Sequence, residues 1–212
     1  MGTIKQGILG GFSGKVGTVI GSSWNGISYM RGRAQHVHNP RSDGQMMQRS
    51  KFTQVLELLK PITAYVRIGF KTYAKQQTAF NAAMAYNVKN AFSGTYPNFV
   101  FEPSQALVSR GNLTQATSAF ATAAAGGVQF SWADNSGEGS AQSTDVAMPL
   151  IFNPVRNEAV FNTSAASRTD TTGTLAVPAD WIGESCICFL GFQSADGNEI
   201  ATSLFLGTVT IS

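Results

Sequence analysis

The spacing of apolar residues changes near residue 98, and this change constrains the fold more than any other feature of the sequence. Before residue 98, apolar residues recur at helical spacing in three stretches, which predicts helices over about 42–60, 61–75 and 76–92. Beyond it, apolar and polar residues alternate between turn-forming runs such as DNSGEG and SADGNE, which is typical of strands. The predicted strands are 99–101, 106–109, 127–132, 144–152, 158–161, 172–177, 185–192 and 200–211.

This order of elements predicts an α+β chain in which a helical part precedes an antiparallel sandwich. About seven strands in the last part, with Trp132 early and Trp181 late, favour an Ig/fibronectin-like β-sandwich. It is expected to be fibronectin-like, because the Cys…Trp…Cys spacing of antibody domains is missing. We predict two domains, 1–97 and 98–212, with an alternative boundary at 123–127 in the small-residue run ATAAAGG.

The N-terminus carries a glycine-rich run, GGFSGKVGTVIGSSWNG, whose six glycines and one lysine raise the question of a phosphate-binding loop. The spacing excludes that motif, because Leu9 stands where its first glycine is needed and Val16 where Ser or Thr must follow the lysine. Instead, Asn25-Gly26 between Trp24 and Ile27 predicts the two-residue turn of a β-hairpin. A continuous strand over 16–24 is expected to enter this turn, and its Gly17 and Gly21 would leave one face flat.

The helix after residue 42 has a recognisable start. Ser42 and Gln45 have the spacing of a capping box, in which the serine hydroxyl accepts from a first-turn N–H and the glutamine reaches back.

Charge is divided unequally between the two parts of the chain. Residues 1–101 contain twelve Lys and Arg against two Asp and Glu, a net charge of +10. Residues 102–212 contain three against ten, a net charge of −7. Such asymmetry predicts either head-to-tail contact between copies or neutralisation of the basic half by nucleic acid. The candidate interaction residues are Lys15, Arg31, Arg33, Arg41, Arg49 and Lys51.

Residues able to support metal or nucleophilic chemistry are few. His36 and His38 share one side of an extended link, and Cys186 and Cys188 share one side of a predicted strand. Two such separate pairs do not make the compact ligand set of a structural zinc site, and two link histidines offer no base for a nucleophile. We therefore predict no catalytic, cofactor-binding or metal-binding residue, no small-molecule substrate, and cysteines that remain reduced because they cannot bridge to each other.

Several blocks of the sequence together resemble a family of uncharacterised Bacteroidota proteins, a domain of unknown function. These blocks are GGFSGKVGTVIGSSWNGISYMRGR, NPRSDGQMMQRSKF, NVKNAFSG, SRGNL, TDVAMPLIFNP, PADWIG and GFQSADGNEIATS. The resemblance covers nearly the whole chain and implies no catalytic residue. The first sixty residues, with a Gly-rich hairpin followed by an Asn-Pro-x-Ser helix start, also resemble some phage-encoded structural proteins.

These observations favour a non-enzymatic structural or assembly protein that self-associates, as a phage or mobile-element virion component. The alternative is a nucleic-acid-binding protein that uses the basic half, with Trp24 or Tyr29 as a stacking platform. A second alternative is a carbohydrate-binding module, which would need exposed aromatic side chains on the sandwich. The sequence predicts no membrane span and no signal peptide, hence a cytoplasmic or virion location.

Overall fold

The computed structural model describes residues 2–4, 7, 10–24, 26–36, 39, 41–95 and 97–212. The chain forms two compact units, residues 1–41 and residues 42–212. The protein has helices and several antiparallel sheets, so the α+β class is confirmed.

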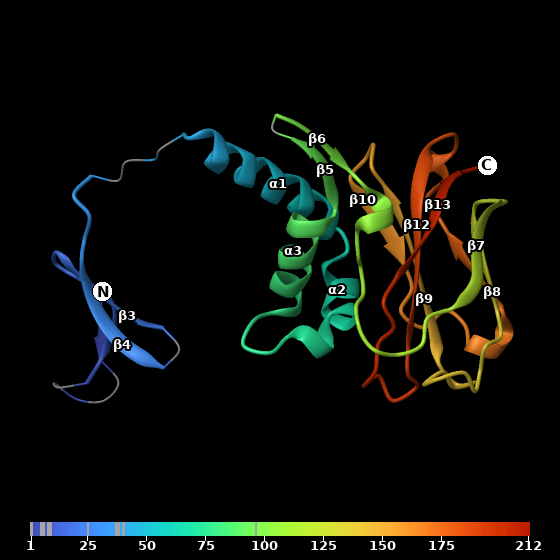
Figure 1. Cartoon of the computed structure of the whole chain (residues 1–212), viewed down its shortest axis with the longest axis horizontal. Coiled ribbons are helices and arrows are strands. Elements are labelled where there is room, and N and C mark those ends of the chain that lie inside the picture. The colour runs from blue at the N-terminus through green and yellow to red at the C-terminus, as the bar shows by residue number, and fades with distance from the viewer. Residues whose placement is uncertain are drawn as a thin grey trace. The chain divides into compact units, whose positions relative to one another are not determined.

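The first unit is a four-stranded antiparallel sheet, here called the N-terminal sheet (Figure 1). Its strands, in spatial order, are β1 (Thr3–Ile4), β2 (Phe12–Val16), β3 (Val19–Trp24) and β4 (Ile27–Gly32). The predicted hairpin register is confirmed, since Trp24 pairs with Ile27, and the pairing continues to Ile20 opposite Arg31.

The turn of this hairpin needs a residue that tolerates positive φ, and Gly26 has a φ of +83°. Its neighbour Asn25, the other predicted turn residue, lies outside the described residues. Of the predicted flat face, only the close approach at Gly21 is observed, because a Cβ there would clash with the backbone oxygen and the ring of Phe12.

The prediction of one continuous strand over 16–24 is wrong. Gly17 adopts a φ of +57°, and a second tight turn at Gly17 and Thr18 pairs Val16 with Val19. The sequence contains the signal for this turn, since Gly17, the first residue of the Gly-Thr pair between two valines, permits the positive φ that reverses the chain.

Replacing Gly26 with valine is expected to destabilise the N-terminal sheet by about 1–3 kcal/mol, since a β-branched residue resists positive φ. Amide hydrogen exchange over β3 and β4 measures the effect, and Gly44→Val in α1, where φ is not positive, is the control. Unchanged protection of β3 and β4 would contradict this turn assignment.

The second unit begins with three helices. They are α1 (Asp43–Leu59), α2 (Thr63–Gly69) and α3 (Ala79–Asn90), with a short 3₁₀ turn η1 (Lys71–Tyr73) before α3. Ser42 is the N-cap of α1 as predicted, but its side chain makes no capping bond, so the capping box is wrong. Residue 42 and the first turn are exposed, so solvent can reach these N–H groups. At α3, Thr78 does cap the helix, accepting from the N–H of Asn81 at 3.1 Å.

Nine strands complete the second unit. A hairpin joins β5 (Phe92–Thr95) to β6 (Asn98–Phe101). One sheet has the order β10-β9-β12-β13, and the other has the order β11-β8-β7. Their strands are β7 (Thr117–Ala124), β8 (Gly127–Ala133), β9 (Val146–Asn153), β10 (Glu158–Phe161), β11 (Thr172–Ala176), β12 (Ser185–Gln193) and β13 (Leu204–Thr210). Short 3₁₀ turns lie at η2 (Pro103–Gln105), η3 (Arg168–Asp170) and η4 (Ala179–Trp181).

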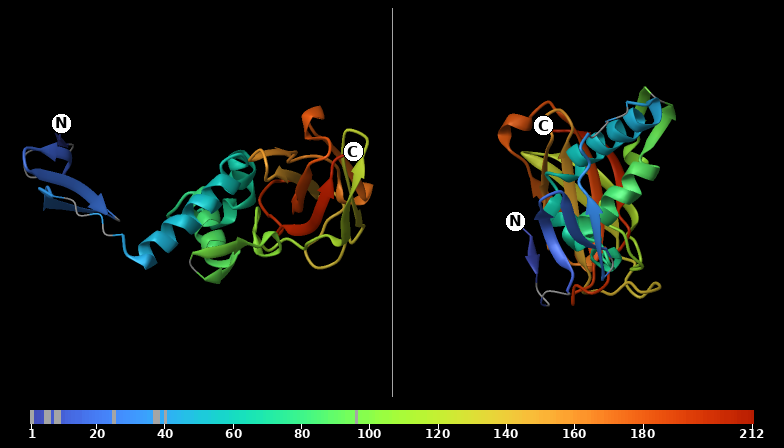
Figure 2. Two further views of the ribbon diagram at one scale, coloured as in Figure 1. Left: turned by 90° about the horizontal axis from the view of Figure 1, so that it is seen from above. Right: turned by 90° about the vertical axis from the view of Figure 1, so that its left-hand side faces the viewer.

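The four-stranded sheet of the second unit, β10-β9-β12-β13, is buried on both faces, with the helices on one side and the three-stranded sheet on the other. The second unit is therefore three layers deep (Figures 1 and 2). On β12, Ile187 and Phe189 pack with the helices, whereas Cys188 and Leu190 pack with the three-stranded sheet. This follows from the period-two alternation of a strand. It also explains why β9 and β12 are almost continuously apolar.

The helices therefore share their core with a sheet that lies beyond residue 98. Tyr65 of α2 illustrates this, because its ring is buried and its hydroxyl donates to the backbone oxygen of Met148 in β9 at 2.9 Å. The predicted boundary at 97/98 lies between β5 and β6, inside the second compact unit.

Two local predictions are corrected by the pairing of this unit. The run ATAAAGG is the end of β7 and a hairpin turn into β8, not a linker. Residues 106–109 are not a strand. Their backbone groups hydrogen-bond to side chains instead of to a neighbouring strand. The Asn87 amide donates to the C=O of Leu107 and accepts from its N–H, and Ser203 Oγ accepts from the N–H of Val108.

Candidate interaction surfaces

One face of the N-terminal sheet combines positive charge with aromatic side chains. In the observed register Lys15 and Arg31 lie on either side of Ile20, and directly paired residues share a face. Alternation along the strands places Trp24 and Tyr29 on that same face. The structure thus brings together two of the predicted basic residues with both predicted aromatic platforms.

The apolar side chains of this sheet are largely exposed. Trp24 is 72% exposed, Met30 71% and Ile27 65%. Of the described residues of β1 to β4, only Gly21 is buried. Sheets are stabilised by covering an apolar face, so this sheet presents a surface suited to association.

The remaining predicted interaction residues are dispersed. Arg33 follows β4, and its N–H donates to the backbone oxygen of Thr18 at 2.7 Å. Arg41 is exposed at the end of the first unit, whereas Arg49 and Lys51 lie on α1 in the second. The ammonium of half-buried Lys51 sits 4.5 Å from the ring centroid of Phe99, a cation–π contact.

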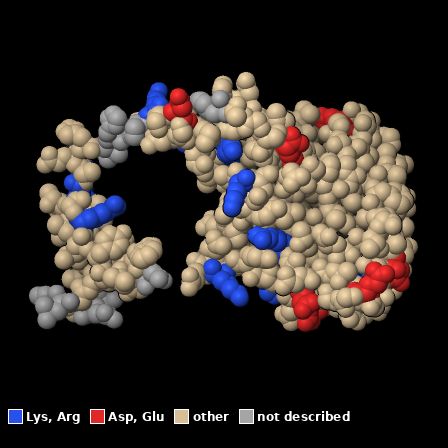
Figure 3. Space-filling model, in the orientation of Figure 1, with Lys and Arg blue, Asp and Glu red and all other residues tan. Residues whose placement is uncertain are grey.

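Charge is also segregated within the second unit. Residues 42–101 hold seven Lys and Arg against two Asp and Glu, and residues 102–212 hold three against ten. On the face shown in Figure 3, most Lys and Arg of this unit lie over the helices, and most Asp and Glu lie over the sheets. Because these residues belong to one compact unit, the segregation is a property of a folded surface.

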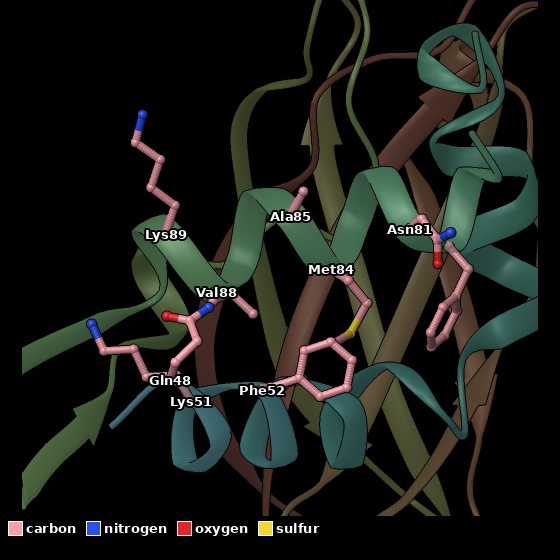
Figure 4. A pocket seen from close by; sticks show the side chains of 9 residues that line it. Gln48, Lys51, Phe52, Asn81, Met84, Ala85, Val88 and Lys89 are labelled. Carbon is pink, nitrogen blue, oxygen red and sulfur yellow. The ribbon is translucent and has the colours of Figure 1, made fainter. Parts of the chain in front are cut away.

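A groove of about 650 Å³ opens between α1 and α3. Phe52, Phe80, Met84 and Val88 contribute its apolar lining, and Phe52 is 51% exposed. Figure 4 shows Lys51 on α1 and Lys89 on α3 at the same end of it, with the Lys89 side chain extended away from α1 and with Phe52 and Met84 facing each other between the helices. We call this cavity the basic groove; Gln48, Asn81 and Ala85 complete its lining.

A buried ion pair is the strongest polar feature that sequence reasoning missed. Arg168 and Asp145 are 0% and 1% exposed at their side chains, and Arg168 Nη2 lies 3.0 Å from Asp145 Oδ2. Arg168 also donates to Asn135 Oδ1 at 2.6 Å and to the backbone oxygen of Thr114 at 2.9 Å. Its guanidinium lies 4.2 Å from the ring centroid of Phe192.

The hydrogen bonds of this ion pair indicate a structural role. Each guanidinium nitrogen of Arg168 already donates to a protein oxygen, so none is left for a ligand. Asp145 additionally accepts from the N–H of Gln142 at 2.9 Å, so this carboxylate also caps a turn. No sequence signal links Asp145 to Arg168, which is 23 positions away.

The candidate metal residues do not converge among the described residues. Both cysteines are free and buried; burial raises the pKa of Cys188 to about 12, and burial with the nearby Glu184 raises that of Cys186 to about 11. His38 lies outside the described residues, and within them no group of three or more His, Cys, Asp and Glu is placed to bind a metal. Such high thiol pKa values make reactive thiolates scarce at neutral pH.

The tryptophans of the sheets are core residues. Trp132 and Trp181 are 4% and 1% exposed, so neither ring can stack on a sugar. Trp132 packs edge-on against Phe192 with ring centroids 5.4 Å apart.

In the part of the chain that the structure describes, no helix is long and apolar enough to cross a membrane.

Comparison with known proteins places the chain in a family. The model of a family of unknown function, DUF6266, matches residues 11–207. The chain belongs to this family. The family match spans both units, from the N-terminal sheet to β13. Searches of curated proteins and of solved structures found no match.

Proposed function

We propose that this member of the family is a non-enzymatic structural protein that works by self-association, as a component of a phage or mobile-element virion assembled in the cytoplasm. The observation that carries the proposal is the N-terminal sheet, whose apolar side chains are exposed. Covering one large apolar side chain contributes roughly 1.5–3 kcal/mol, so covering Trp24 and Ile27, which share a face, would contribute substantially to association.

Charge supports a second copy as the partner. Residues 1–41 contain five Lys and Arg and no Asp or Glu, whereas residues 102–212 carry a net charge of −7. Opposite charges on two ends of one molecule favour contacts between unlike ends and disfavour contacts between like ends. We therefore propose a head-to-tail contact in which the basic N-terminal part of one copy meets the acidic sheets of the next.

The strand order supports an Ig/fibronectin-like assignment of the sheets. Counted from β7, the first, second and fifth strands form one sheet, and the third, fourth, sixth and seventh form the other. Immunoglobulin constant domains divide their strands in the same way except for the fourth, which here pairs with the third. We propose a fibronectin-like sandwich on this basis, a scaffold used widely for recognition and assembly.

Reversing Arg31 and Arg33 to glutamate tests the self-association. The double variant is expected to lose oligomers in the absence of nucleic acid, because both reversed charges lie in the N-terminal unit that meets the acidic surface. Size-exclusion chromatography with light scattering, at low and high salt, measures this. The matched control reverses Lys60 and Lys75, both exposed on the second unit, and changes the net charge equally. Wild-type protein that stays monomeric at every salt concentration would refute the proposal.

Nucleic-acid binding is the second candidate, and the shared face of Lys15, Arg31, Tyr29 and Trp24 favours it. Basic side chains beside exposed aromatic rings can bind phosphates and stack on bases. Under this alternative the Arg31→Glu/Arg33→Glu variant remains as assembled as wild type but no longer shifts single-stranded DNA or RNA.

A further inference from the structure

Two turns of the second unit form an exposed apolar projection with an acidic rim. Val155, in the turn between β9 and β10, is 76% exposed, and Ile182, directly after η4, is 61% exposed. They are the two most exposed large apolar residues described in residues 42–212. We call this projection the acidic knob; it comprises Val155, Arg156, Glu158, Asp180, Ile182 and Glu184.

Arg156 holds the two turns together. Its guanidinium lies 2.6 Å from the carboxylate of Asp180 and 2.8 Å from that of Glu184, and it donates to the backbone oxygen of Asp180 at 2.5 Å. Trp181, buried beneath the knob, donates from Nε1 to Glu158 at 3.3 Å. One arginine among three carboxylates leaves the knob with a net charge of −2.

The contacts of Arg156 hold the acidic knob in a fixed shape. The hydrogen bonds from Arg156 and Asn153 hold the pKa of Glu184 below its usual range. Ordered exposed apolar side chains with a charged rim are the usual anatomy of an interface, since apolar contact supplies affinity and the rim sets orientation.

The basic groove has the complementary properties. Its apolar lining includes Phe52, Met84 and Val88, and its two cations, Lys51 and Lys89, lie at one end (Figure 4). The volume of about 650 Å³ has room for two aliphatic side chains.

We infer that the acidic knob of one copy binds in the basic groove of a second copy. This contact rests on the proposed self-association and assigns it a second pair of surfaces, both within residues 42–212. Ile182 and Val155 cover the apolar lining, while Asp180 and Glu184 approach Lys51 and Lys89. Because the knob and the groove are different surfaces of one unit, the contact either pairs two copies reciprocally or repeats from copy to copy.

Charge argues against the N-terminal sheet as the occupant of this groove. Residues 1–41 contain no Asp or Glu, so that sheet would bring positive charge to a positively charged rim. The acidic knob brings apolar side chains and negative charge together.

Charge reversal on each surface, followed by mixing, tests the contact. Lys89→Glu places a negative charge in the groove, which repels the acidic knob. Asp180→Lys places a positive charge on the knob, which repels the basic groove. Each full-length variant alone is expected to self-associate about tenfold or more weakly than wild type in sedimentation velocity. An equimolar mixture is expected to recover assembly, because the groove of the Lys89→Glu variant accepts the knob of the Asp180→Lys variant and the two unaltered surfaces accept each other.

Asp180→Lys also breaks the Arg156–Asp180 ion pair, so a variant that changes no charge on the knob is needed as a second test. Ile182→Ser is expected to weaken association by a similar factor, whereas Val100→Ser, a matched control at a 56% exposed aliphatic side chain on β6, is expected to leave it unchanged. Circular dichroism confirms that each variant is folded.

The outcomes separate this contact from the proposed function. Association of all variants at wild-type strength overturns the knob–groove contact and leaves self-association standing. Weakening by Lys89→Glu that mixing does not reverse means that the groove meets a different surface of the second copy, which also overturns the knob–groove contact. A wild-type protein that never associates overturns both.

Discussion

Replacing Arg168 with methionine is expected to destabilise the folded protein by about 3–5 kcal/mol, the cost of removing one partner from a buried ion pair. Methionine fills much of the same volume, so the loss comes from the polar groups that remain. Asp145 and Asn135 would each lose a donor in the buried interior, and the backbone oxygen of partly buried Thr114 would lose one as well. Urea unfolding followed by tryptophan fluorescence measures the free energy of unfolding.

The matched control is Arg156→Met, because Arg156 also pairs with two carboxylates but its side chain is 32% exposed. Exposed ion pairs contribute at most about 1 kcal/mol, so this variant is expected to unfold close to wild type. Removing the stranded charge as well, in Arg168→Met/Asp145→Leu, is expected to recover a large part of the lost stability. Equal losses in Arg168→Met and Arg156→Met would contradict the structural role of the buried pair.

Replacing Tyr65 with alanine is expected to lower the free energy of unfolding by about 3–5 kcal/mol and to weaken helices and sheets together. Tyr65 is a helical residue, but its ring packs edge-on against Phe161 of β10 with centroids 5.7 Å apart, and its hydroxyl donates to β9. Its loss leaves a cavity between the two kinds of element.

Two signals test whether helices and sheets unfold as one. Far-ultraviolet circular dichroism reports the helices, and tryptophan fluorescence in a Trp24→Phe background reports Trp132 and Trp181 in the core between the sheets. The two transitions are expected to coincide in wild type and in Tyr65→Ala, and Tyr29→Ala on the N-terminal sheet should leave both unchanged. Two separate transitions would instead support a domain boundary at residue 98.

Features governed by neighbouring residues could be predicted from the sequence. The Trp24-Asn25-Gly26-Ile27 segment specifies its register because a two-residue turn leaves only one way to pair the flanking strands. The three helices could be predicted from the spacing of apolar residues and from Pro61 and Gly94, residues that interrupt or end a helix. The small errors are also local, as at Gly17, where one glycine was assigned to a strand but forms a turn.

Features that join distant residues could not be predicted. Residues 106–109 alternate like a strand, but side chains of Asn87 and Ser203 take the place of a neighbouring strand. The alanine-rich β7 resembles a linker and becomes a strand only by pairing with β8. In both segments the available hydrogen-bond partner decides the structure, and the partner is set by the fold.

The same distinction between local and long-range features applies to the candidate surfaces. The sequence by itself determined the excess of positive charge before residue 102 and of negative charge after it, because net charge depends on composition alone. Only the tertiary structure decided that Arg168 is buried while Arg156 is exposed, that Lys51 and Lys89 flank one apolar groove, and that Val155 and Ile182 project from the acidic knob. The physical reason is that burial and proximity are set by long-range packing, which local spacing does not specify.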